Sequence, residues 1–344
     1  MLVALALALG GCASLGYLAQ AGVGMLEIMH RARPIEDVLR DARTQPELAR
    51  LLAEIPTIKA YGESRGLKRT NNYVEFVQLD RSAVVWAVSA CERLGFEPRS
   101  WRFPVVGSFT YLGWFRRDQA ERHARRLRDE GLDVDVSGAS AFSTLGWFKD
   151  PVFSTMIRGG DDRLGAFVNV LLHESVHATL HVKDQTTFNE SVASFVADRL
   201  TLEYLEATRG RAAREYVAYA ESRDRAARRA RAVRHAHDTL KAVYASDRPD
   251  AEKLEEKRRV LGELATAIRF GGTLNNATLV AMRAYGSEDT DAGLASVLSA
   301  CGSDWRRFFR TLAPLASQSP AHFARPQQKD LGPVLSALAR EGCR

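Results

Sequence analysis

The sequence predicts a mostly helical α+β protein in which a small sheet lies beside a metal-binding helix. Three observations predict this fold class. Apolar residues recur at helical spacing through most of the 344 residues. β-branched and aromatic residues gather between turn signals in the stretch from 73 to 136. Further along, an apolar helical run carries His173 and His177, which are separated by one helical turn.

Length and composition are those of a folded protein with a substantial core. The chain is 46% hydrophobic and 26% charged, and it can form one large domain or two small ones. A net charge of +6 is modest, and no recognised nucleic-acid motif accompanies it, so we expect no nucleic-acid partner. An anionic membrane surface accounts more easily for the basic balance. The sequence leaves the oligomeric state open.

The first residues are typical of a bacterial lipoprotein signal. Leu2–Leu9 is apolar, too short to span a bilayer and suited to the core of a signal peptide. The motif LGGC at 9–12 is similar to a lipobox, so we expect residues 1–11 to be a signal peptide and Cys12 to carry lipid. That lipid would anchor the protein at the periplasmic side of the envelope, in the outer membrane because Ala13 follows the cysteine. A plain secretory signal or a buried apolar start is the alternative, and no basic residue precedes the run, which leaves the start codon open.

Residues 12–70 are predicted to form a helical scaffold without chemistry of its own. Helical spacing covers 15–30, a second helix begins at Pro34, and a third covers 46–65 with an interruption at Pro56.

Residues 71–204 are predicted to form the catalytic core. We expect strands at 73–77, 83–88, 101–111 and 132–136, and a basic helix at 119–130. The segments YLGWF at 111–115 and TLGWF at 144–148 nearly repeat each other, which indicates a shared packing device rather than a functional motif.

The C-terminal part of the chain is predicted to be helical and charged. Residues 205–270 should form a helical hairpin that is broken at 247–250. Its charges are expected to form mainly a solvated face, with an arm for anionic lipid or a partner protein as the alternative. Residues 271–344 should complete the core, with a helix near 274–285 and a peripheral tail from Ala316.

The sequence His173-Glu174-Ser175-Val176-His177 is an H-E-x-x-H motif in an apolar helix. Positions i and i+4 share a helix face, so His173 and His177 can bind one ion. Glu174 projects beside them and is placed to activate water rather than to bind the metal. Glu190 follows in a second helical run and is the expected third ligand, which gives a donor set typical of catalytic zinc. The alternative is an ordinary amphipathic helix with two half-buried histidines.

Three segments together resemble a known family. They are FSTLGWFKDP at 142–151, HESVHATL at 173–180 and FNESVASFVAD at 188–198. They are similar to the bacterial family of predicted aminopeptidases, which are zinc metallopeptidases of the H-E-x-x-H plus downstream Glu type, often made as lipoproteins. The resemblance extends from Cys12 past Tyr285. It implies a zincin-like fold and peptide hydrolysis.

The resemblance also assigns roles that the motif alone does not. It implies Tyr285 as the proton donor opposite the metal, because the family has a tyrosine at the matching position after paired asparagines. The family often has histidine where this chain has Thr278, and cysteines where it has Arg102 and Ser108, so a family disulfide is missing here.

Other residues are weaker candidates for the site. Tyr204, Tyr219 and His235 are rivals of Tyr285, although packing explains each of them more readily. Asp198 is a candidate acceptor for a ligand histidine, because it lies about two turns beyond Glu190. His181 should lie beyond the helix end, exposed.

Zincins bind a substrate as an added strand at a sheet edge beside the metal helix, because main-chain hydrogen bonds hold any peptide. Residues 136–142 are the candidate edge, and a strand with a glycine bulge is the alternative.

Cys91, Cys301 and Cys343 allow one disulfide with one free thiol, or none.

The sequence therefore predicts a zinc-dependent peptide-bond hydrolase in which Glu174 activates water at an ion held by His173, His177 and Glu190. A non-catalytic envelope lipoprotein with a vestigial metal site is the competing class, and a zinc amidase acting on peptidoglycan peptides is a third possibility. No group for the substrate's ammonium is identified, and the motif Gly-x-Met-Glu-Asn is absent, so "peptidase" is a firmer prediction than "aminopeptidase".

Overall fold

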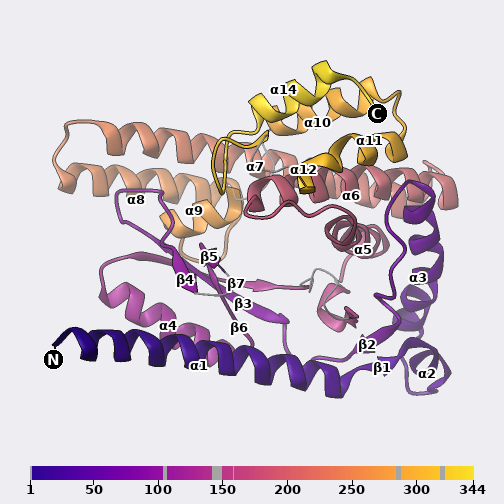
Figure 1. Ribbon diagram of the computed structural model, residues 1–344, viewed down its shortest axis with the longest axis horizontal. Helices are drawn as coiled ribbons and strands as arrows, with labels where there is room; N and C mark the ends of the chain where they lie inside the picture. Colours follow the sequence, from indigo (N-terminus) through magenta and orange to yellow (C-terminus); the bar gives the residue numbers. More distant parts are fainter. Residues whose placement is uncertain (1, 104–106, 142–148, 158, 284–287, 318–321) are drawn as a thin grey trace. The chain divides into compact units, whose positions relative to one another are not determined.

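The computed structural model describes residues 2–103, 107–141, 149–157, 159–283, 288–317 and 322–344. The described chain is mostly helical with small sheets, so the predicted α+β class is confirmed (Figure 1). It forms two compact units, each assembled from three separate segments. The first unit contains residues 1–32, 78–141 and 225–283, and the second contains 33–77, 142–224 and 284–344. The contiguous domains predicted from the sequence remain predictions.

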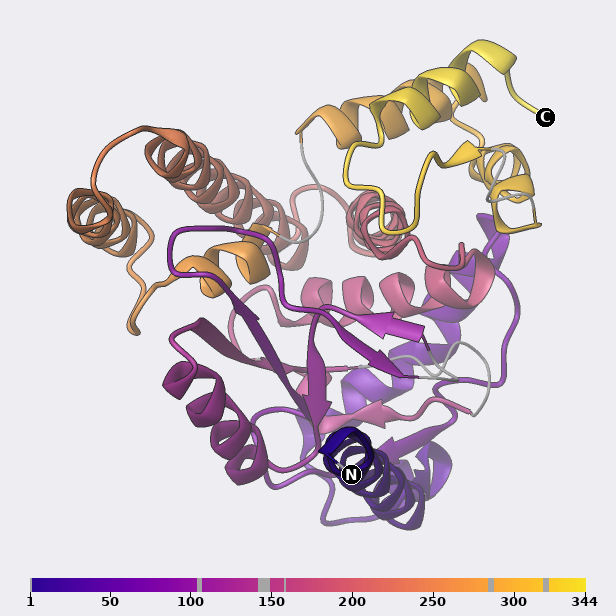
Figure 2. The ribbon, with the colours of Figure 1, turned by 60° about the vertical axis from the view of Figure 1, so that its left-hand side comes forward.

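The first unit has a three-stranded antiparallel sheet with helices packed against it. Strand β3 (Val85–Cys91) lies between β6 (Leu112–Trp114) and β7 (Asp133–Ala139). Alternate β3 residues face α4 (Arg117–Asp129), whose small apolar residues recur at helical spacing on the facing side (Figure 2). Beside this sheet, β4 (Trp101–Phe103) and β5 (Gly107–Phe109) pair with each other, so the segment predicted to be β-rich at 101–111 contains two strands rather than one.

Helix α1 (Leu2–Arg31) packs on this sheet through its second half. The Gln20 side chain donates to the Gly113 carbonyl at 3.1 Å and accepts from the Phe115 N–H at 3.3 Å. A Cβ on Gly24 would lie 2.1 Å from the Phe115 ring, so only glycine allows the ring to lie on the helix. Among the described residues, no helix combines the length and the apolar character needed to cross a membrane.

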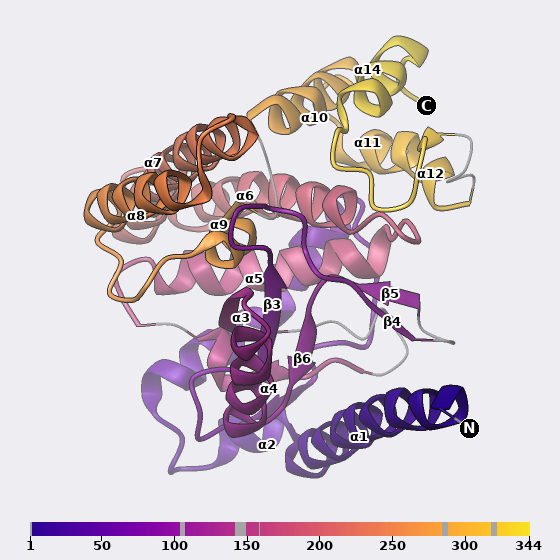
Figure 3. The same ribbon diagram turned by 90° about the vertical axis from the view of Figure 1, so that its left-hand side faces the viewer.

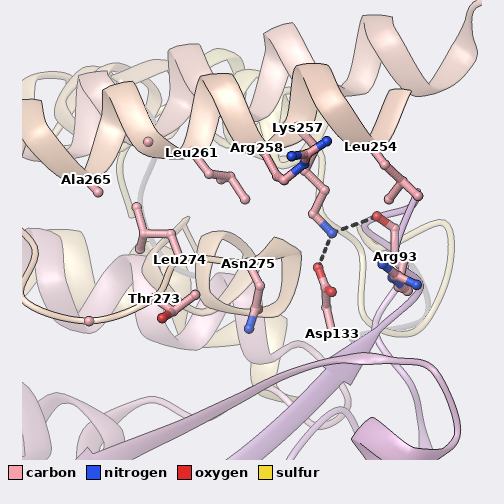
Figure 4. A pocket seen from close by; sticks show the side chains of 12 residues that line it. Arg93, Asp133, Leu254, Lys257, Arg258, Leu261, Ala265, Thr273, Leu274 and Asn275 are labelled. Atoms are coloured by element: carbon pink, nitrogen blue, oxygen red, sulfur yellow. Dashed lines mark hydrogen bonds and ion pairs between the residues drawn. The ribbon is translucent and has the colours of Figure 1, made fainter. Parts of the chain in front are cut away.

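Two helices cover most of the segment that was predicted as a helical hairpin. Helices α7 (Arg214–Ala245) and α8 (Asp250–Ala267) run antiparallel (Figure 1), and their apolar residues form a core with α9 (Asn276–Arg283). The buried Lys257 ammonium anchors α8, because it bonds the Asp133 carboxylate and the Arg93 carbonyl at the rim of a cavity of about 460 Å³ (Figure 4). Its charge is thereby paired and hydrogen-bonded, as a buried charge requires.

The second unit is built around three helices, α3 (Pro46–Ser64), α5 (Arg163–Thr179) and α6 (Thr186–Arg209). Helix α3 continues through Pro56, so the predicted interruption is wrong. Leu52, Ile55 and Ile58 are buried on both sides of the proline, and their packing outweighs the hydrogen bond that proline removes. Helix α2 (Ile35–Arg40) precedes α3 and packs against it.

A small mixed sheet completes the N-terminal part of this unit. Strand β2 (Glu75–Val77) pairs antiparallel with β1 (Arg33–Pro34) and parallel with β8 (Val152–Phe153), which leads into a 3₁₀ turn at Ser154–Met156.

The C-terminal helices belong to the core of the second unit. They are α10 (Glu288–Ala300), α11 (Trp305–Leu312), α12 (Pro314–Ser317) and α14 (Gly332–Glu341), and α10 lies beside α14 (Figure 3). A disulfide joins Cys301 to Cys343, while Cys91 is free and buried. The prediction of a peripheral tail is wrong, because Leu331 and Leu335 are each only 1% exposed.

Candidate metal centre

The metal-site helix α5 is fixed by its apolar face. Phe167, Val168, Leu171 and Leu172 are at most 1% exposed, and they hold α5 between α3 and α6 (Figure 3). Gly165 lies in the first turn of α5, and a Cβ there would lie 2.5 Å from the Tyr219 ring. Packing on both sides therefore sets the rotation of α5 and the direction in which its histidines point.

The three predicted ligands meet at one point. The His173 Nε2 atom lies 3.2 Å from the His177 Nε2 atom and 3.2 Å from the Glu190 Oε2 atom. The His177 Nε2 atom lies 3.5 Å from Glu190 Oε1, and one ligand atom from each residue lies within 4.8 Å of the other two. Two imidazole nitrogens and one carboxylate oxygen are donors that zinc prefers. The donor set therefore fits a metal ion.

Burial and the neighbouring charges shift the pKa values of the predicted ligands in opposite directions. The Glu190 side chain is 27% exposed, and although burial raises its pKa, the contacts with His173 and His177 outweigh burial and lower that pKa to about 2. Burial lowers the pKa of His173, but the contact with Glu190 and the charge of Glu174 outweigh it, so this pKa is raised. Glu190 therefore carries the negative charge that a cation at this point needs.

Glu174 differs from the ligands in having no hydrogen-bond partner among the residues that the structure describes. Burial raises the pKa of its carboxyl, and the two histidines only partly oppose this. A carboxylate with a raised pKa and free lone pairs is suited to accept a proton from water.

Asn189 positions Glu190, and it was not predicted. Its amide donates to the Val182 carbonyl and its carbonyl accepts from the Val182 N–H, both at 2.8 Å. Gln185, in the same loop, donates to the Arg325 carbonyl at 2.9 Å and accepts from the Gln328 N–H at 3.1 Å. The only signal for the role of Asn189 in the sequence was the position of a polar amide next to the proposed ligand Glu190.

Asp198 does not take the predicted role. Among the described residues its carboxylate accepts from Asn169 at 3.0 Å and from the Tyr219 hydroxyl at 3.4 Å, and it pairs with Arg223. Its charge contributes to the raised pKa of His173, but it accepts no hydrogen bond from that ring. Asp198 therefore affects the site only through its negative charge, which favours protonated His173. Its hydrogen bonds and ion pair connect α6 to α5 and α7.

The other tyrosines serve packing. Tyr204 is fully buried and donates to Glu54 at 2.8 Å, and Tyr219 lies against Gly165. His181 lies beyond the end of α5 and is exposed, as predicted, and His235 is exposed on α7 in the first unit. Tyr285 lies outside the described residues, so its predicted role stays a prediction.

The predicted edge strand is only partly described. Strand β7 ends at Ala139 and is an edge of its sheet, and the rest of the segment, from Phe142, lies outside the described residues, as does the second aromatic repeat at 144–148. Asn275 donates to the Val134 carbonyl at 2.9 Å, and Thr278 bonds back to Asn275. Because β7 and the metal ligands belong to different units, the placement of β7 beside α5 stays a prediction.

The geometry defines a protein with a two-histidine, one-carboxylate group that can hold a metal ion. A family model described as "Putative aminopeptidase" matches residues 16–325. The chain belongs to this family, which confirms the predicted resemblance. No curated protein matches the chain, and no solved structure matches it.

Proposed function

We propose that the protein is a zinc-dependent peptide-bond hydrolase in which His173, His177 and Glu190 hold the ion and Glu174 is the general base. The observation that carries this proposal is the convergence of three ligand atoms within 4.8 Å, next in sequence to a half-buried carboxylate with a raised pKa. The family's description as aminopeptidases supports the same reaction.

Each residue has a defined task in this reaction. A bound zinc ion polarises the substrate carbonyl and makes a water molecule more acidic. Glu174 takes the proton of the attacking water and delivers it to the departing amine. Glu190 is anionic well below neutral pH, so it holds a cation throughout the range in which Glu174 works. His173 and His177 stay one turn apart because α5 is packed on both sides.

A structural zinc site is less well supported. A closed site needs four protein ligands, and the described residues bring together three. His181, the nearest further histidine in sequence, is exposed beyond the end of α5. A three-ligand set leaves a position for substrate or water, as catalytic zinc requires.

The test uses Glu174→Gln with Glu206→Gln as a matched control, because Glu206 is exposed on α6. All proteins are purified without the first 11 residues, and zinc content and cleavage of a mixed peptide library are measured. We expect all three to bind one zinc, and E174Q to lose about 10²- to 10⁴-fold in kcat. The cut sites decide between exopeptidase and endopeptidase action. If the wild type binds no zinc, or if E174Q keeps full activity, the proposal fails.

We also propose that lipid on Cys12 anchors the protein at the periplasmic side of the outer membrane, on the basis of the motif at 9–12. Palmitate labelling of the full chain and of Cys12→Ser tests this. The proposal predicts labelled wild type in the membrane fraction and unlabelled C12S outside it, and an unlabelled wild type would contradict it.

A further inference from the structure

The inner face of α1 is fixed against the sheet of the first unit. The Tyr17 hydroxyl accepts a hydrogen bond from the Gly113 N–H at 3.2 Å, and the Tyr17 ring meets the Trp114 ring edge-on at 5.5 Å between centroids. Ile28 is only 2% exposed. Together with Gln20 and Gly24, these α1 residues follow a helical spacing of three and four positions. Packing therefore sets the rotation of α1 and decides which of its residues face outward.

The outer face of α1 carries no charge. Between residues 16 and 29, every position that the structure describes as exposed is apolar or lacks a side chain, namely Gly16, Ala19, Gly22, Val23, Leu26 and Met29. Val23 and Leu26 are each 66% exposed, and Met29 is 51% exposed. The first charged residue of the whole chain is Glu27. A helix at a protein surface normally turns charged and polar residues outward, so this face has the composition of a covered surface.

The exposed apolar residues are in register with the predicted lipid attachment site. We call Ala19, Val23, Leu26 and Met29 the outer stripe. Position 12 precedes positions 19, 23 and 26 by two, three and four helical turns, so all four positions lie on one face of α1. From position 12 to position 26 the helix axis is roughly 21 Å long. A lipid attached at position 12 therefore brings the membrane to the face of α1 that carries the outer stripe.

Basic groups gather beside the C-terminal end of the outer stripe. Burial lowers the pKa of the Arg81 guanidinium, and the charges of Arg31 and Arg116 lower it further, while the charge of Glu27 opposes them. Arg31 pairs with Glu27 at 3.2 Å, and Arg81 donates to the Phe115 carbonyl at 2.8 Å. Three guanidinium groups thus lie near a single carboxylate of α1. This positive rim complements the negative charge of anionic lipid headgroups.

We propose that α1 lies in the surface of an anionic lipid bilayer, with the outer stripe in the apolar boundary and Arg31 and Arg116 at the headgroups. The proposal goes beyond the hydrolase function and is independent of it. It rests on the proposed lipid at Cys12 only for the identity of the membrane.

An interfacial helix of this kind is held by its buried apolar area and by attraction to anionic lipids. Four side chains bury little area, but a lipid on the same helix makes their contact with the membrane intramolecular, which raises their effective concentration. The lipid and the outer stripe together would fix which face of the first unit is turned toward the membrane.

A second copy of the chain fits the outer stripe less well. A stable protein–protein interface uses roughly 20–30 residues on each side. The outer stripe offers four, and the arginines beside it would meet the same arginines of a second copy. A bilayer needs no such area and supplies the opposite charge.

The test uses the form left after signal removal, without residues 1–11, and carries Cys12→Ser so that no lipid is attached. Its inner-face contacts, at 17–28, are retained. This parent chain is compared with Val23→Ser/Leu26→Ser (V23S/L26S). The control is Val74→Ser/Val217→Ser (V74S/V217S), because these valines are 46% and 44% exposed outside α1. Cosedimentation with phosphatidylcholine vesicles, with and without phosphatidylglycerol, measures the partition coefficients.

We expect the parent chain to bind tighter when phosphatidylglycerol is present, and V23S/L26S to lose about 10-fold or more in partition coefficient, because two apolar side chains no longer enter the bilayer. V74S/V217S should bind as the parent does. A second readout places an environment-sensitive fluorophore on Leu26→Cys or on Val217→Cys, which is feasible because Cys91 is buried. Vesicles should shift the emission at position 26 to the blue and leave that at position 217 unchanged.

Equal partitioning of V23S/L26S and the parent chain would overturn the proposal, and so would an unshifted emission at position 26. A parent chain that forms dimers, which V23S/L26S dissociates, would assign the outer stripe to a second copy and refute the membrane contact. Failure of the lipid anchor is separate, because palmitate labelling detects it at Cys12 whereas the vesicle experiment contains no attached lipid.

Discussion

Asn189 forms both of its side-chain hydrogen bonds with the backbone of Val182, each at 2.8 Å. Asn189 is 5% exposed and immediately precedes Glu190, so this pair of bonds fixes the first turn of α6 against the end of α5. The distance from the carboxylate of Glu190 to the two histidines depends on that turn. Asn189 is therefore expected to influence metal binding without being a ligand itself.

Asn189→Ala should weaken zinc binding by about 10- to 100-fold, because outer residues that orient ligands typically contribute this much to affinity. Competition with a chromophoric chelator measures the zinc affinity of each variant. Asn71→Ala is the control, since Asn71 is exposed in the same unit. Equal zinc affinities in N189A and N71A would show that the α5–α6 loop holds Glu190 without this side chain.

Removal of the metal should destabilise the second unit. A ligand at 100 times its dissociation constant stabilises the native state by about 2.7 kcal/mol, so stripping zinc with a chelator should lower Tm and adding zinc should restore it. His177→Ala should be insensitive to both treatments, and His235→Ala should respond like the wild type, because His235 is an exposed residue of α7. A zinc-dependent Tm in H177A would place the ion elsewhere.

The disulfide joins Cys301 to Cys343, which lie 42 positions apart in the sequence. For a loop of this length, the loop-entropy model gives a stabilisation of about 4 kcal/mol. Reduction, or the double change C301S/C343S, should lower the denaturant midpoint accordingly. Cys91→Ala should respond to reduction as the wild type does, because Cys91 is a free thiol. A midpoint unaffected by reduction would mean that the C-terminal helices are held by packing alone.

Cys91 should make stability depend on alkaline pH. Burial raises the pKa of this thiol from 9.0 to about 12. Above pH 9 the unfolded chain loses a proton that the folded chain keeps, so the folded state loses relative stability as pH rises toward 12. The free energy of unfolding of wild type minus that of Cys91→Ala should therefore fall between pH 9 and 12. A constant difference across this range would contradict the burial of the thiol.

Asn276 should be one of the most sensitive positions of the first unit. It is fully buried, donates to the carbonyls of Glu92, Arg93 and Gly95, and accepts from the Tyr244 hydroxyl. Asn276→Ala removes all of these bonds, although the Arg93 carbonyl keeps its bond from Lys257, and should cost about 3 kcal/mol or more, whereas Tyr244→Phe removes one bond and should cost about 1 kcal/mol. Chemical denaturation gives both values, and similar losses in the two variants would rule out the three carbonyl contacts as the cause.

The part of the site that the sequence predicted is the local part. His173 and His177 are one turn apart on one helix, so their geometry follows from helix periodicity alone, and Glu190 lies on the next helix. The hairpin α7–α8 was predictable for the same reason, since its apolar spacing and its break at 247–250 are local signals.

The features that were missed depend on contacts distant in sequence. The pairing of Asn72 with Asp150 joins residues 78 positions apart, and nothing near Tyr73 indicates that its backbone is left-handed. Helix α3 continues through Pro56 because buried neighbours hold it, which a rule about proline alone does not capture. The tail was expected to be peripheral because its prolines are a local signal, whereas its burial depends on α10 and the disulfide.

The division of the chain has a consequence for experiments that use fragments. The chain passes from one compact unit to the other five times, after residues 32, 77, 141, 224 and 283. No single cut can therefore release either unit whole, and a protease that nicks one crossing leaves four covalent links. A shortened chain that begins at residue 33 still carries two of the first unit's three segments without the third. Isolated units of this protein should consequently be obtained by co-expression of their separate pieces, rather than by truncation.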